Sequence, residues 1–185
     1  MKRIFGLALI ASALTACSST EEVAKADCAF PDKSEAPSWY CEKATSTDQP
    51  SYFYLGSSSV KAESSTQERL AVANATVKLS QELDSSITSL VNEREQINTS
   101  AGVSVSKKFV EISSTLMTDT KLTGVRQYES AVDESGQRWV LVGISQADYL
   151  DIKQRVIAQS IEDLQQQPLT DAEQTEVFSL KSLLN

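Results

Sequence analysis

The side chains best suited to chemistry in this 185-residue chain are three cysteines and two pairs of carboxylates, and histidine is absent. Without histidine, a serine or cysteine nucleophile lacks its usual general base, and a metal ion lacks its commonest nitrogen ligand. The carboxylate pairs are Glu93 with Glu95 and Asp148 with Asp151. Paired carboxylates can hydrolyse glycosides, but these pairs have the spacing of solvated residues on a helix surface. The residue types therefore predict no catalytic, metal or cofactor site, and we expect a protein that is not an enzyme.

The first cysteine, Cys17, ends a segment with the layout of a secretory signal. Two basic residues precede an apolar stretch that ends at Leu14 and is too short to cross a membrane as a stable helix. Leu14-Thr15-Ala16-Cys17 resembles a bacterial lipobox, which implies cleavage before Cys17 and acylation, for example with palmitate. Several acyl chains hold a protein firmly on a membrane, and Ser18 favours sorting to the outer membrane. We therefore expect an outer-membrane anchor with the domain facing the periplasm, the alternative being an ordinary signal peptide with a chance cysteine.

The other two cysteines, Cys28 and Cys41, form an even pair. In an oxidising compartment such a pair predicts a disulfide, which would stabilise the fold by about 3 kcal/mol through its effect on the unfolded chain. A metal pair and two free thiols are the alternatives. A zinc site would need further cysteine or histidine ligands, and no basic cluster is nearby to lower the pKa of a thiol. We therefore favour the disulfide.

The composition is that of an acidic globular chain. Hydrophobic residues make up 41% and charged residues 23%, which excludes wholesale disorder. The formal net charge is −8, and binding to nucleic acid needs a basic patch that this chain lacks. An acidic domain is also not attracted to an anionic membrane surface, so the lipid alone would hold it there.

Hydrophobic periodicity predicts the elements that follow the cysteines. Residues 52–56 predict a short strand, and residues 65–94 predict a long amphipathic helix behind a capping box. Residues 98–120 fit a strand or a helix, and we favour a short helix. Two strands over 122–132 and 137–144 form a hairpin. The expected apolar stripe of the long helix consists of Leu70, Ala73, Val77, Ser80, Leu83, Ile87 and Leu90, and Ala71 with Ala75 forms a second edge of small residues.

Two further helices are expected after the hairpin, the first capped at Ser145 and the second at Thr170. The strand 139–144 is apolar on both faces, which predicts that it lies in the middle of a sheet covered on both sides. The long helix would cover one face. Either the C-terminal helices or a second protomer would cover the other.

The predicted fold class is α+β: a β-α-β-β core with a small antiparallel sheet packed on the long helix, followed by C-terminal helices. The chain would divide into four parts. These are a signal peptide (1–16), a lipidated tether with the disulfide (17–50), an α+β domain (51–166) and a C-terminal helical tail (167–185). Trp39 and Tyr40 are too aromatic for a plain tether, and we expect them to pack back on the domain.

Five short motifs follow one another between residues 37 and 145. They are Pro37-Ser38-Trp39, Tyr54-Leu55-Gly56-Ser57, the helix pair Ala71 and Ala75, Leu122-Thr123-Gly124-Val125, and Gly136 followed by Trp139-Val140-Leu141-Val142. This series resembles the LPP-twenty type of outer-membrane lipoprotein, which includes FlgP-like lipoproteins of the flagellar basal disk. The resemblance implies a three-stranded antiparallel sheet against the long helix and no catalytic residues. Gln67, where a third helix alanine is expected, and the longer tail after Pro168 depart from it.

These observations predict a lipid-anchored outer-membrane lipoprotein with a structural or protein-interaction role in the cell envelope, such as a flagellar accessory. A periplasmic binding or regulatory module acting on envelope enzymes is the alternative. The partner would be a second copy of the chain or another envelope protein, because anchoring on a surface lets weak contacts build an array. The expected contact surface is Trp139 together with an exposed stripe on the last helix, formed by Val177, Leu180 and Leu184.

Overall fold

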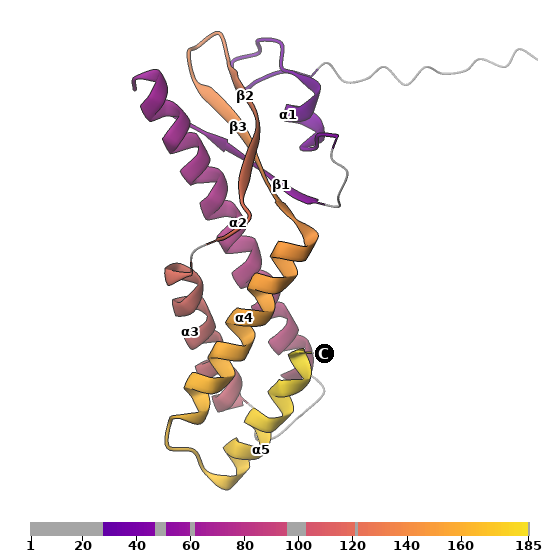
Figure 1. Cartoon of the computed structure of the whole chain (residues 1–185), viewed down its shortest axis with the longest axis vertical. Helices are drawn as coiled ribbons and strands as arrows, with labels where there is room; N and C mark the ends of the chain where they lie inside the picture. The colour runs from indigo at the N-terminus through magenta and orange to yellow at the C-terminus, as the bar shows by residue number, and fades with distance from the viewer. Residues whose placement is uncertain (1–27, 47–50, 60–61, 96–102, 121, 185) are drawn as a thin grey trace, which may run out of the picture.

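The computed structural model describes residues 28–46, 51–59, 62–95, 103–120 and 122–184. The predicted lipidation site Cys17 lies outside this range. The elements in chain order are α1 (Ser38–Glu42), β1 (Ser51–Ser57), α2 (Ser64–Glu95), α3 (Val103–Asp119), β2 (Arg126–Val132), β3 (Arg138–Ser145), α4 (Gln146–Gln165), α5 (Asp171–Leu180) and the 3₁₀ turn η1 (Lys181–Leu184). The fold class is α+β, as predicted. Figure 1 shows the sheet and α1 at one end, α3 and α5 at the other, and α2 running along both.

The sheet has three antiparallel strands in the order β1-β3-β2. The central strand is β3, as its two apolar faces predict, and four of its residues are fully buried: Val140, Leu141, Val142 and Ile144. A tight turn joins β2 to β3, with Gly136 at a φ of +85°, a conformation that glycine adopts without steric cost. None of the helices within the described ranges is long and apolar enough to cross a membrane.

The first half of α2 covers one face of the sheet with its small residues. Ala71 and Ala75 are fully buried against Val140 and Val142. The expected stripe is wrong here, because Leu70 and Val77 are 43% and 53% exposed. Farther along, α2 buries every fourth residue in the helical half of the molecule, and these residues are Leu79, Leu83, Ile87 and Val91.

The reason for the alanine edge is the close approach of β1 to α2 at Gly56. A Cβ atom at Gly56 would overlap the carbonyl oxygen of Ala71 and lie 2.7 Å from the backbone nitrogen of Ala75. Strand and helix backbones therefore touch at this point, and only residues with small side chains fit there. Gln67, the departure from the family pattern, lies one turn before Ala71, and its side-chain amide donates to the carbonyl oxygens of Ser59 and Gly136.

At Trp139 the other face of the sheet is covered by the segment 28–46, and at Gly143 the rings of Phe53 and Tyr128 lie over it. The expected cover was the C-terminal helices or a second protomer; instead Tyr40, one of the two aromatic residues expected to pack back on the domain, lies on this face. The ring of Tyr40 lies 5.1 Å from that of Trp139, and the ring of Phe30 lies 5.9 Å from it, centroid to centroid. Phe30 is only 5% exposed. The folded part of the chain thus includes residues that precede the expected domain boundary at residue 51.

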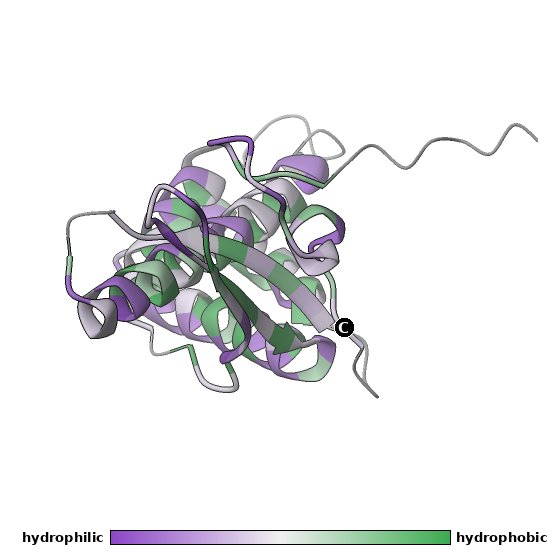
Figure 2. Ribbon diagram, turned by 90° about the horizontal axis from the view of Figure 1, so that it is seen from above, coloured by the Kyte–Doolittle hydropathy of each residue, from purple (hydrophilic) through white to green (hydrophobic). Residues whose placement is uncertain are grey.

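The helical half is built by α3, α4 and α5 against the second half of α2. The expected helix over residues 98–120 is α3, which buries Val105, Phe109 and Met117. β3 continues into α4 through Ser145, whose side-chain oxygen accepts from the backbone nitrogen of Asp148 at 3.0 Å, the predicted cap. Seen from above in Figure 2, the hydrophobic stretches gather toward the middle of the molecule.

Candidate functional site

Of the carboxylates singled out in the sequence, Asp148 and Asp151 have structural partners. Asp148 accepts from the hydroxyl of Ser145 at 2.6 Å, and Asp151 pairs with the Arg155 guanidinium at 3.0 Å. Both therefore hold α4 rather than line a cleft. In the ranges that the structure describes, no group of three or more cysteine, aspartate or glutamate residues is placed to hold a metal ion.

Cys28 and Cys41 lie at disulfide distance, with their Cα atoms 5.9 Å apart, which agrees with the predicted bridge. The loop between them is fastened to the β2–β3 turn. The Asp32 carboxylate accepts from the backbone nitrogen of Ser135 at 2.9 Å and from both the hydroxyl and the nitrogen of Ser34. The bonds from Ser34 lower the pKa of the Asp32 carboxyl.

A second carboxylate, Asp133, organises the turn beneath this loop. It accepts from the indole nitrogen of Trp139 at 2.9 Å, from the Ser135 hydroxyl at 2.7 Å and from the backbone nitrogen of Gln137 at 2.9 Å. Burial by itself raises the pKa of Asp133, but these hydrogen bonds outweigh it and the net shift is downward. The indole N–H of Trp139 therefore has its hydrogen-bond acceptor within the chain.

The expected contact stripe on the last helix is wrong. Val177 and Leu180 are 1% and 3% exposed and belong to the core, and Leu184 is half-buried against it. The reason is that α5 folds back on α3 and α4, and the following turn η1 reaches α2. Glu173 pairs with Lys108 on α3 at 2.9 Å, and Arg94 on α2 bonds to Ser182.

Trp139 is likewise unsuitable as a contact residue. Its ring is half-buried beneath Phe30 and Tyr40 of the N-terminal segment. Trp139 was expected at a contact surface because the strand 139–144 is apolar on both faces. An apolar residue that packs in the core and an apolar residue on a docking surface have the same spacing in the sequence. Periodicity alone therefore does not distinguish the two.

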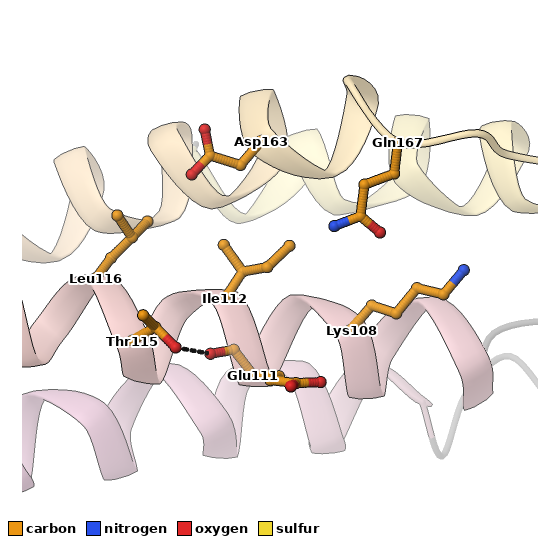
Figure 3. A pocket seen from close by; sticks show the side chains of 7 residues that line it. All are labelled: Lys108, Glu111, Ile112, Thr115, Leu116, Asp163 and Gln167. Atoms are coloured by element: carbon orange, nitrogen blue, oxygen red, sulfur yellow. Dashed lines mark hydrogen bonds between the residues drawn. The ribbon is translucent and has the colours of Figure 1, made fainter.

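A more open surface lies between α3 and α4, where two adjoining hollows of about 380 and 400 Å³ share Leu116. Figure 3 shows the first hollow, with side chains from α3 on one side and, on the other, Asp163 of α4 and Gln167 just after it. Its lining residues are Lys108, Glu111, Ile112, Thr115, Leu116, Asp163 and Gln167. The second is lined by Leu116, Thr120, Arg155, Val156, Ala158, Gln159 and Glu162. We call the two hollows together the α3–α4 groove.

The rim of the α3–α4 groove carries unbalanced negative charge. Its two cations are already paired, Lys108 with Glu173 at 2.9 Å and Arg155 with Asp151 at 3.0 Å. Three rim carboxylates, of Glu111, Glu162 and Asp163, make no ion pair within the described part of the chain. Asp163 accepts only an uncharged amide, from Gln159 at 2.8 Å.

The pairing of Lys108 is electrostatically robust. Hydrogen bonds from the backbone of Thr170 and from Lys108 lower the pKa of the Glu173 carboxyl to about 2. Glu173 is therefore ionised at neutral pH, where its carboxylate accepts from the Lys108 ammonium. The positive charge of Lys108 is thus neutralised by Glu173, outside the groove.

No family model, curated protein or solved structure matches this chain. The groove is lined by apolar side chains that lie between charged ones. Its two threonine hydroxyls, of Thr115 and Thr120, donate to carbonyl oxygens of their own helix at 2.9 and 2.6 Å, so neither is paired with a base. An apolar floor between charged rims suits an apolar side chain with polar flanks. The sequence reasoning missed this groove, although the spacing of Ile112 and Leu116 placed both on one helical face.

Proposed function

We propose that this protein is an outer-membrane lipoprotein, anchored through acyl chains on Cys17, that has a structural or protein-interaction role in the bacterial cell envelope. The observation that carries the proposal is the lipobox-like Leu14-Thr15-Ala16-Cys17 behind a basic, apolar start. The pair Cys28 and Cys41 at disulfide distance supports it, because disulfides persist in oxidising compartments such as the periplasm. The series of motifs that resembles LPP-twenty lipoproteins supports it further.

The anchor would keep the domain close to the membrane. Cys28 follows Cys17 by eleven positions, and eleven residues reach at most about 40 Å. The domain would then meet its partner within a thin layer beside the membrane, where anchoring raises the effective concentration. The α3–α4 groove is the contact surface that we propose, because it is hollow and its floor is only partly covered.

Lipidation is tested by intact-mass analysis of the protein extracted from membranes. We expect the chain to begin at Cys17 with three acyl chains, and Cys17→Ala to give an unprocessed or soluble protein. An unmodified Cys17 in the membrane-extracted protein would overturn the anchor.

The interaction role is tested by photo-crosslinking in whole cells. A photo-reactive residue at position 112, on the groove floor, should give one discrete crosslinked species. The same residue at position 77, which is exposed on α2, is the matched control and should not give that species. If position 112 yields no crosslink to any protein, or the same one as position 77, the interaction role of the groove fails.

A further inference from the structure

The α3–α4 groove has the dimensions and the floor of a site for a helix. Its lining residues on α3 run from Lys108 to Thr120, which is about 18 Å of helix at 1.5 Å per residue. Ile112 and Leu116 lie one turn apart on α3, and Val156 of α4 lines the second hollow together with Leu116. A row of apolar side chains between two helices is the surface that receives an amphipathic helix with apolar residues at a spacing of three and four.

The charge of the rim selects between possible occupants. Glu111 and Glu162 are exposed on opposite sides of the groove, and Asp163 stands beside Glu162. An occupant with lysine or arginine on both flanks of its apolar face would complement them. A second copy of this chain, with a formal net charge of −8, would instead be repelled, because like charges across an interface oppose association.

We propose that the α3–α4 groove binds a basic amphipathic helix of a partner protein. This rests on the proposed function and assigns the chemistry of its partner. The helix lays apolar side chains over Ile112 and Leu116, and its basic residues face Glu111 on one rim and Glu162 on the other. The apolar floor supplies affinity, and the solvated rim charges supply specificity and speed of association.

The probe is a fluorescent 18-residue peptide with leucines at a helical spacing of three and four and lysines elsewhere. Its comparators are the same peptide with glutamate in place of lysine, and a scrambled sequence of the same composition. Binding is measured by fluorescence anisotropy on the full chain in neutral-detergent micelles, with empty micelles as the blank. The double variant Glu111→Lys with Glu162→Lys reverses the charge of two rim residues. Glu42→Lys with Glu134→Lys makes the same change of net charge at exposed positions away from the groove.

We expect the lysine peptide to bind, and the rim variant to weaken binding at least about tenfold, since two reversals place like charges against the peptide. The control variant should change the dissociation constant less than twofold. Equal losses in both variants would show attraction to net charge alone and would overturn the proposal. Equal binding of the glutamate or scrambled peptide, or no binding at all, would also overturn it. Self-association that the rim variant abolishes would make a second copy the occupant, again against the proposal.

Failure of the proposed partner chemistry and failure of the interaction role give different results. If the peptide does not bind while position 112 still crosslinks to a partner in cells, the basic chemistry is wrong and the interaction role stands. If position 112 gives no crosslink, the interaction role of the groove fails, whatever the peptide does.

Discussion

The close approach of β1 to α2 at Gly56 makes Gly56→Ala the most informative single substitution in the fold. The added methyl group would overlap the carbonyl oxygen of Ala71 and lie 2.7 Å from the nitrogen and 2.9 Å from the Cβ of Ala75. Two of these three neighbours are backbone atoms. They cannot rotate away, so the helix and the sheet must separate along this contact.

Inserting one carbon into a packed core costs about 1–3 kcal/mol when side chains can adjust. Because backbone must move here, we expect about 3 kcal/mol or more of lost unfolding free energy. For a chain of this size each kcal/mol corresponds to about 2–4 °C, so the melting temperature should fall by roughly 6–12 °C. The measurement is urea and thermal unfolding of the oxidised protein, followed by circular dichroism.

Two other glycines supply matched controls. A Cβ at Gly136 meets nothing within 4 Å, so Gly136→Ala costs only the strain of its φ of +85°, about 1–2 kcal/mol. At Gly143 the nearest atoms belong to the rings of Tyr128 and Phe53, which can turn. Ala75→Gly added to Gly56→Ala removes only the Cβ contact and should not restore stability. If Gly56→Ala costs less than Gly136→Ala, or if Ala75→Gly rescues it, the backbone contact is not the cause.

Three further measurements check other parts of the fold. Gln67→Ala deletes the amide that bonds to the carbonyls of Ser59 and Gly136, so urea unfolding should show a loss of about 1–3 kcal/mol, whereas an unchanged midpoint would refute the role of that amide. The Glu173 carboxyl has a pKa of about 2 in the fold against an ordinary 4.5, so its stabilisation is complete above about pH 4.5 and is lost as the pH falls through 2. Glu173→Gln should therefore flatten the acid limb of the stability curve between those values, and an unchanged limb would contradict the pairing. Peptide mapping without reductant should find Cys28 and Cys41 cross-linked, and their double replacement by alanine should raise amide exchange in residues 28–46 more than in α2. Two free thiols in protein from the periplasmic side would contradict the bridge.

The helices and strands of this fold follow from local patterns of residue types in the sequence. Alternation and helical spacing predict β1, the hairpin and the long helix, although β2 begins at Arg126 and not at residue 122. The cap residues Ser145 and Thr170 set where two helices begin. The central place of β3 followed from its two apolar faces. Such features depend on residues near one another in the chain, so they could be predicted.

The predictions that were wrong concern which surfaces of the elements pack against one another. The buried edge of α2 is the one with Ala71 and Ala75, because Gly56 on another element brings the backbones together. Val177 and Leu180 turn inward because α5 packs back on α3 and α4, where both side chains join the core. In both cases the deciding partner is distant in sequence, and hydrophobic spacing is the same for a core stripe and a docking stripe. The α3–α4 groove could not be predicted for the same reason, since it exists only once two helices are placed side by side.

The pairing of Cys28 with Cys41 has a mechanical consequence for a domain held at Cys17. Tension from the anchor would enter the fold at Cys28 and pass through the sulfur atoms directly to Cys41. The intervening residues 29–40 would carry no load, so Phe30 and Tyr40 could stay on Trp139 while the chain is pulled. The tension would be transmitted onward to Ser51 at the start of β1. Phe30 and Tyr40, which lie on the sheet at Trp139, would not be loaded. With the disulfide reduced, the same tension would pass through residues 29–40, and these residues would detach from the sheet first.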